Sequence, residues 1–235
     1  MKKILCIPAF ALLAVPVSLA VPGAAQAQTF QGGYVGLEGA YSTGDADYAG
    51  APGYGSISID GFDGGIYGGY NHQSGNTVVG IEADASLGGA SGTGSMSSTD
   101  WCGALAPCLP NIDAAWKYDI TSSYSLRARA GYEVVVNTMI FATGGVAVAN
   151  ADWKNPLGVV GVTFNPALGP ALDFSETHVG WVLGAGFEYQ IGANIRLKGE
   201  GLYYDYGDQT YAVGGFPHPI DLSVAAFRVG LAYTF

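Results

Sequence analysis

The sequence predicts an all-β protein: an eight-stranded antiparallel transmembrane β-barrel with short turns at one end and long loops at the other. Three observations support this fold class. Apolar and polar residues alternate with a period of two in successive segments, the breaks between segments are alternately short and long, and aromatic residues gather near both ends of the apolar faces. No sustained 3.6-residue periodicity accompanies the alternation, which argues against helices.

Eight segments carry this alternation. It is clearest in residues 77–87, 123–132, 177–189 and 227–235, and weaker in residues 31–42, 61–71, 138–150 and 195–205. In the second segment, Leu126 and Ala128 share one face while Arg127 and Arg129 share the other, because successive strand residues point to opposite faces. Residues 138–150 are apolar on both faces, so their register stays open.

The breaks between the segments sort into two kinds. Short breaks fall at residues 72–76, 133–137 and 190–194, and long ones at residues 43–60, 88–115, 151–174 and 206–220. An even number of strands with short periplasmic turns and long extracellular loops is typical of bacterial transmembrane barrels. Both ends of the barrel domain then lie on the periplasmic side.

Large aromatic residues on the apolar faces form two expected girdles. Near the short turns these are Tyr70, Tyr132, Tyr189 and Tyr233, and towards the long loops they are Tyr41, Phe62, Tyr124, Trp181 and Tyr203. Aromatic belts mark the two membrane–water interfaces. A soluble β-sandwich or lipocalin-like barrel would also alternate, but its core gives no reason to sort aromatic residues to both strand ends.

The first 27 residues are interpreted as a secretory signal peptide. Lys2 and Lys3 give a basic start, a mostly apolar stretch follows, and Ala25 and Ala27 form an A-x-A cleavage site that would leave Gln28 as the first residue of the mature chain. A membrane-spanning helix is the competing interpretation, but prolines interrupt the apolar stretch. The expected domains are therefore the cleaved signal, 1–27, and the barrel, 28–235.

The mature chain is strongly acidic. Removing Lys2 and Lys3 from nine basic residues leaves seven against 19 acidic residues, a net charge of −12. Such a chain repels phosphate, so nucleic-acid binding is not expected.

Ten charged residues fall on the polar faces and are expected inside the barrel. They are Glu38, Asp63, Glu82, Asp84, Arg127, Arg129, Glu188, Lys198, Glu200 and Arg228. Charges in so narrow a space should form ion pairs and hydrogen bonds. An ion-pair network that plugs the lumen is favoured, because eight strands leave only enough room for side chains. The alternative is a narrow, cation-preferring pore lined by carboxylates.

The long loops offer binding surface rather than chemistry. Cys102 and Cys108 are close in sequence, and in an exported chain we expect them to form a disulfide. The histidines, His72, His178 and His218, have no serine or aspartate partner at a defined spacing. We expect no enzymatic activity, no metal site and no cofactor, while the acidic loops could contact a host surface or another extracellular ligand.

Several short segments together carry a family resemblance. They include Val79–Asp84, Ser125–Tyr132, Gly180–Gly186 and the terminal Tyr233–Phe235. With the signal peptide and in this order, they make the chain resemble the small outer-membrane β-barrel proteins of the opacity-porin and OmpA-like transmembrane-domain type. The match covers the whole mature chain.

The resemblance implies a place in the outer membrane of a Gram-negative bacterium, with the loops at the cell surface. Its partners would be outer-membrane lipids, lipopolysaccharide and the assembly machinery, which would recognise the alternating Val229, Leu231, Tyr233 and Phe235. The function expected is a structural or surface role with a lumen closed by ion pairs. The alternatives are the narrow cation-preferring porin and an adhesin that acts through acidic extracellular loops.

Overall fold

The computed structural model describes residues 29–48, 56–96, 114–154, 174–213 and 216–235, nearly all of them in strands. The strands are β1 (Gly32–Tyr48), β2 (Ile57–Ser74), β3 (Thr77–Gly88), β4 (Ser91–Met96), β5 (Ala114–Val135), β6 (Thr138–Lys154), β7 (Phe174–Gln190), β8 (Ile195–Val213) and β9 (Phe216–Thr234). In this described part, no helix is long and apolar enough to span a membrane.

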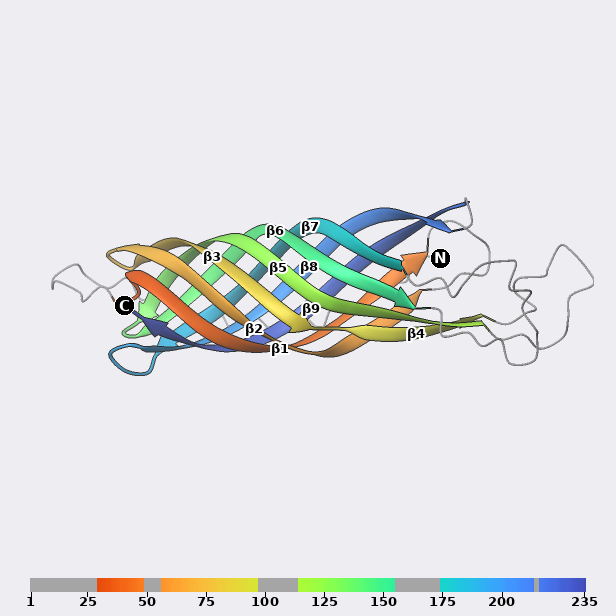
Figure 1. The fold of residues 1–235 in the computed structure, drawn as a ribbon. Helices are drawn as coiled ribbons and strands as arrows, with labels where there is room; N and C mark the ends of the chain where they lie inside the picture. The colour runs from red at the N-terminus through yellow and green to blue at the C-terminus, as the bar shows by residue number, and fades with distance from the viewer. Residues whose placement is uncertain (1–28, 49–55, 97–113, 155–173, 214–215) are drawn as a thin grey trace, which may run out of the picture.

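The strands form one closed antiparallel barrel (Figure 1). Consecutive strands pair with one another, except that β3 and β4 both lie between β2 and β5 and do not pair with each other. β9 returns to β1 through a ladder from Tyr34–Thr234 to Tyr48–Ile220. The start of β1 and the end of β9 therefore lie at the same end as the short turns. Closure pairs the backbone groups that an open sheet would leave at its edges, and the predicted eight-stranded barrel is confirmed.

Strands β3 and β4 together make one of the eight wall strands. Between the pairs Leu87–Ser122 and Ser91–Asp119, this strand uses three residues where β5 uses two. Gly88, within this extra length, has a φ of +83° that L side chains rarely adopt. The ladder resumes at once, since the Ile120 N–H donates to the Ala90 carbonyl at 3.0 Å. The irregularity is a β-bulge, which bends the wall without opening it.

The loops are shorter than the sequence predicted. Residues 206–220 were expected to be a loop, but β8 and β9 form a hairpin there with pairing up to Val213–Phe216. Pro217 and Pro219 made this segment resemble a loop, because proline has no backbone N–H to donate to a ladder. The ladder between β9 and β1 reaches only Ile220, so the two prolines lie where β9 has no β1 residue to pair with.

The outward face of the barrel is apolar. The structure also defines which residues of β6 lie on that face. Ile140 and Val146 face outwards, whereas Met139, Phe141 and Ala147 are buried inside. Both faces of β6 are apolar because the interior itself has apolar zones. The long-loop half of the interior holds an apolar cluster of 17 buried residues: Ala46, Ile57, Ile59, Ala90, Tyr118, Ile120, Ala147, Ala149, Ala151, Val182, Leu202, Tyr204, Tyr206, Ile220, Leu222, Val224 and Ala226.

A short segment before β1 covers the barrel mouth at the short-turn end. Phe30 is fully buried against Val78, Met139 and Phe141. Its N–H donates to the Gln73 side chain at 2.8 Å, and the backbone N–H of Gln73 donates to the Gln31 side chain at 2.7 Å. These contacts hold the segment across the opening.

The position of the Tyr67 ring depends on glycines in β1 and β9. A Cβ on Gly230 would lie 2.8 Å from Tyr67 Cε1, and one on Gly36 would lie 2.6 Å from the same atom. Both distances are shorter than real Cβ contacts allow, so the two glycines make room for the ring.

Replacing Gly230 by valine should therefore displace the Tyr67 ring. We expect Gly230→Val to lower the free energy of unfolding by about 1–3 kcal/mol, as over-packing usually does. Urea unfolding in lipid vesicles, followed by tryptophan fluorescence, would measure it. Gly201→Val is the matched control, because nothing lies within 4 Å of a Cβ there. Equal stability of the two variants would contradict the packing argument.

Candidate functional site

The candidate site is a cluster of charged side chains in the middle of the barrel interior, here called the lumen network. Its acidic members are Glu38, Glu82, Asp84, Glu188 and Glu200, and its basic members are Arg127, Arg129, Arg196, Lys198 and Arg228. The residues come from β1, β3, β5, β7, β8 and β9. Residues two positions apart on a strand point to the same face, so network members from the same strand share its inward face.

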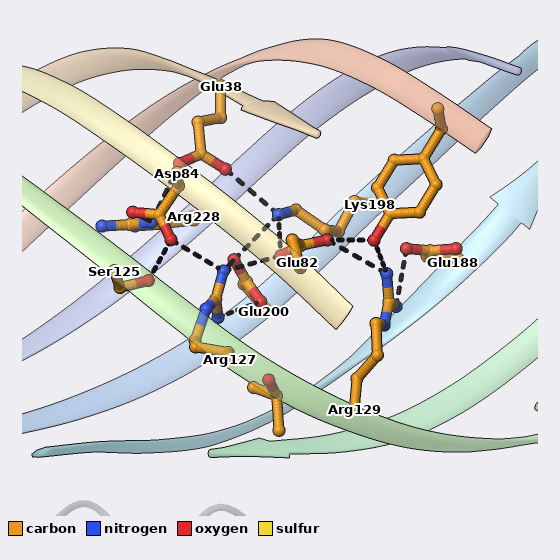
Figure 2. Close-up of polar contacts among 12 residues, drawn as sticks. Glu38, Glu82, Asp84, Ser125, Arg127, Arg129, Glu188, Lys198, Glu200 and Arg228 are labelled. Atoms are coloured by element: carbon orange, nitrogen blue, oxygen red, sulfur yellow. Dashed lines mark hydrogen bonds and ion pairs between the residues drawn. The ribbon is translucent and has the colours of Figure 1, made fainter. Parts of the chain in front are cut away.

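Arg127 lies at the centre of the network and is fully buried (Figure 2). Its Nη2 is 2.6 Å from Glu82 Oε1 and 3.2 Å from Asp84 Oδ2, and its Nη1 is 3.0 Å from Glu200 Oε2. Ser125 adds a hydrogen bond to Asp84. One guanidinium therefore joins carboxylates from β3 and β8 across the lumen, as its planar fork of donors permits.

Lys198 makes a second crossing point. Its Nζ lies 3.1 Å from Glu38 Oε2, 3.1 Å from Glu82 Oε1 and 3.0 Å from Glu200 Oε1. The ammonium also lies 3.6 Å from the centre of the Tyr67 ring, a cation–π distance. Three carboxylates and one aromatic face thus surround a single buried ammonium group.

Arg228 and Arg129 extend the network towards the two ends of the barrel. Arg228 Nη1 lies 2.8 Å from both Glu38 Oε1 and Asp84 Oδ1. Arg129 reaches Glu82 Oε2 at 3.0 Å and Glu188 Oε1 at 2.7 Å. Each carboxylate of the network therefore lies within ion-pair distance of at least one basic group.

The short-turn side of the network is bounded by aromatic rings. Arg129 donates to the Tyr34 hydroxyl at 2.8 Å and lies 4.1 Å from the centre of the Phe141 ring. Arg196 lies 3.3 Å from Glu188 Oε2 and 5.0 Å from the centre of the Phe30 ring. The rings separate the charges from the mouth of the barrel.

The five acids and five bases balance in charge. A buried charge without a partner is strongly unfavourable, and a paired one is tolerated only when its remaining hydrogen-bonding groups are satisfied. Because of this balance, removing one member leaves a net charge among buried side chains.

The structure places the ten charged residues predicted from the sequence on the inner side of the wall, and nine of them join the network. Asp63 does not: it is half-buried and accepts a hydrogen bond from Ser42 Oγ at 3.1 Å. The sequence reasoning missed Arg196, although its spacing from Lys198 and Glu200 places all three on one face of β8. It also missed Tyr34 and Tyr67, which contribute rings and hydroxyls to the same space.

The residues predicted for the girdles point outwards. They are Tyr41, Phe62, Tyr70, Tyr124, Tyr132, Trp181, Tyr189, Tyr203 and Tyr233, and each is at least 39% exposed. At the long-loop end, the Tyr41 and Phe62 rings lie 5.0 Å apart and the Trp181 and Tyr203 rings 5.8 Å apart. These distances allow ring contacts between neighbouring strands.

Other predicted sites have different outcomes. Val229, Leu231, Tyr233 and Phe235 are exposed on the outer face of the last strand and beyond it, and their part in assembly stays a prediction. The proposed cleavage site at Ala25, Ala27 and Gln28 and the proposed disulfide between Cys102 and Cys108 lie outside the described residues.

Within the described ranges, no group of three or more histidine, cysteine, aspartate or glutamate side chains could hold a metal ion. The buried His178 faces Tyr118, with 3.1 Å between Nε2 and the hydroxyl. His72 is exposed beside a short turn. Ion pairs are the polar interactions that the charged side chains of the described interior make most often.

Known proteins match this chain over most of its length. The family model for the outer membrane protein beta-barrel domain matches residues 10–235. The 31 kDa outer-membrane immunogenic protein of Brucella melitensis is 31% identical over 227 residues, which cover 91% of this chain and 88% of the relative. A 22 kDa outer membrane protein of Rhizobium leguminosarum is 27% identical, covering 88% of this chain and 80% of the relative.

Solved structures of similar architecture include Neisserial surface protein A. It is 14% identical, with a TM-score of 0.48, and the match covers 87% of this chain and 98% of that structure.

Charge balance in the lumen network can be tested at Arg127. We expect Arg127→Met to lower the free energy of unfolding by about 3–5 kcal/mol, because it leaves buried carboxylates without their shared cation. The double variant Arg127→Met/Glu200→Gln restores neutrality and should recover part of the loss. Urea titration of the refolded barrel would measure both.

Lys117→Met is the control for that experiment. Lys117 is 45% exposed and pairs with Asp119 at 2.8 Å, so its loss should cost about 1 kcal/mol or less. A double variant no more stable than Arg127→Met would contradict the balance argument.

Proposed function

Because this chain belongs to the outer membrane protein beta-barrel domain family, we propose that it is an outer-membrane surface protein with a closed, non-conducting lumen. The barrel then serves as a rigid anchor, and its function lies in the parts exposed at the cell surface. The observation that carries the proposal is the neutral lumen network of five acids and five bases.

The layers on either side of the network support a closed lumen. The apolar cluster fills the interior towards the cell surface, and Phe30 covers the periplasmic mouth. An eight-stranded barrel is just wide enough for its side chains to fill. An ion crossing this barrel would have to displace apolar side chains and separate buried ion pairs.

A narrow, cation-preferring porin is the alternative that this geometry disfavours. A carboxylate filter needs acidic groups that are available to a passing cation. The acidic groups of the lumen network are each already within 3.3 Å of an arginine or lysine nitrogen. The negative charge of these carboxylates is therefore already neutralised by the protein's own arginine and lysine side chains.

The same proposal assigns the protein no enzymatic activity and no cofactor. Its relatives are named as outer-membrane immunogenic proteins or outer membrane proteins. We propose outer-membrane lipids, lipopolysaccharide and the assembly machinery as its partners in the membrane, the last through the exposed Tyr233 and Phe235.

Surface binding is a second candidate role, favoured by the distribution of charge. Five of the seven basic residues expected in the mature chain lie in the lumen network, which leaves only Lys117 and Lys154 elsewhere. The end of the barrel that faces outwards is therefore strongly acidic, and an adhesin acting there would bind a cationic partner.

Single-channel recording tests the closed lumen directly. The mature chain, refolded in detergent and checked by a heat-sensitive gel shift, should give no steady current in a planar bilayer at high potassium chloride concentration. The reason is that the lumen network and the apolar cluster leave no continuous aqueous path. Reproducible cation-selective openings from folded protein would instead establish the porin.

A further inference from the structure

Residues 29–31, here called the strap, cross the mouth of the barrel at its short-turn end. The strap precedes β1, and its central residue, Phe30, is fully buried. The Phe30 ring packs against Val78 of β3 and against Met139 and Phe141 of β6, all on the inner face of the wall. An apolar ring therefore covers the interior at this end.

Gln73 of β2 holds the strap on one side of the mouth. Its Oε1 accepts the Phe30 N–H at 2.8 Å, and its own N–H donates to Gln31 Oε1 at 2.7 Å. Its Nε2 donates to Glu133 Oε2 at 2.8 Å and to the Gly75 carbonyl at 2.9 Å. One buried side chain thus connects the strap to β5 and to the turn that follows β2.

Arg196 of β8 holds the strap on the other side. Its guanidinium carbon lies 5.0 Å from the centre of the Phe30 ring, and its Nη2 donates to the Thr29 carbonyl at 3.4 Å. Its Nη1 lies 3.3 Å from Glu188 Oε2 in the lumen network. Because β1 and β9 separate β2 from β8 in the wall, the strap is held from two distant parts of it.

The strap can leave this position without opening the wall. None of its residues belongs to a strand. The ladder between β1 and β2 begins at Gly32–Asn71, and the ladder between β1 and β9 begins at Tyr34–Thr234. At the junction, Gly32 has a φ of +107° that L side chains rarely adopt. Segments held by a few contacts open locally at a lower free energy than paired strands.

We propose that the strap is a releasable cover, and that its opening admits small water-soluble molecules from the periplasm to the Arg196–Glu188 end of the lumen network. Opening moves the Phe30 ring off Arg196 and breaks its hydrogen bond with Gln73, while the ladders stay paired. The apolar cluster at the long-loop end stays in place, so the open form has a vestibule rather than a pore. This inference rests on the proposed closed lumen and specifies how its periplasmic end opens.

Thiol labelling in phospholipid nanodiscs measures the opening. The chain begins at Gln28, carries serine in place of Cys102 and Cys108, and has one reporter, Val78→Cys. Val78 is 1% exposed and packs against Phe30, so a membrane-impermeant methanethiosulfonate reagent should modify the reporter only when the strap is open. Mass spectrometry of the folded protein gives the labelling rate.

Two strap variants should speed this labelling. Phe30→Ala removes the ring, and Gln73→Leu removes the side chain that accepts the Phe30 N–H, so each should raise the rate at least about tenfold. Asn194→Ala is the matched control and should leave the rate unchanged. Asn194 lies at the same end of the barrel, but its side chain donates to the Thr234 carbonyl at 2.8 Å rather than to the strap.

A second reporter separates strap opening from loosening of the whole barrel. Val224→Cys is the same substitution in the apolar cluster of the long-loop half. It should be labelled at least about tenfold more slowly than Val78→Cys, and Phe30→Ala should not speed it. The proposal is overturned if Phe30→Ala leaves the Val78→Cys rate unchanged or accelerates both reporters equally. Steady current through the unchanged chain in a planar bilayer would instead overturn the closed lumen, whatever the strap variants do.

Discussion

The constraint on which this structure depends is the pairing of backbone hydrogen bonds in hydrocarbon. Each unpaired N–H or C=O group there costs several kcal/mol, so strands can cross a membrane only as a closed sheet. The ladder between β1 and β9 meets this requirement by joining the first and last strands. The described ladder between β7 and β8 ends at Trp181–Asp205, in the upper aromatic girdle, whereas the ladder between β8 and β9 continues to Val213–Phe216.

Closure also determines what the interior must contain. An apolar outer face leaves the polar residues of each strand inside, where a buried charge without a partner is strongly unfavourable. The ion pairs of Arg127 and Lys198 with carboxylates of β1, β3 and β8 meet this need. The same bases are thereby withdrawn from the surface. Because most of the basic residues lie in the interior, the interior is neutral and the exterior is acidic.

The sequence predicted the strands that have one polar and one apolar face, because the alternation of polar and apolar residues follows directly from these two faces. It predicted β6 less well, since Met139 and Ile140 are both apolar although one is buried inside and the other faces lipid. It did not predict the hairpin at residues 206–220, where prolines imitate a loop. The sequence also could not predict the ion pairs of the lumen network. A polar face shows that a side chain points inwards, but not which side chain it meets across the lumen.

Phe30 has a consequence for the order in which the barrel is completed. Its ring packs against Met139 and Phe141 of β6 and lies beneath Arg196 of β8, while its N–H bonds Gln73 of β2. This buried position of Phe30 exists only where strands from distant parts of the chain lie together. A segment that precedes β1 therefore has its buried position only where β2, β6 and β8 are together in place.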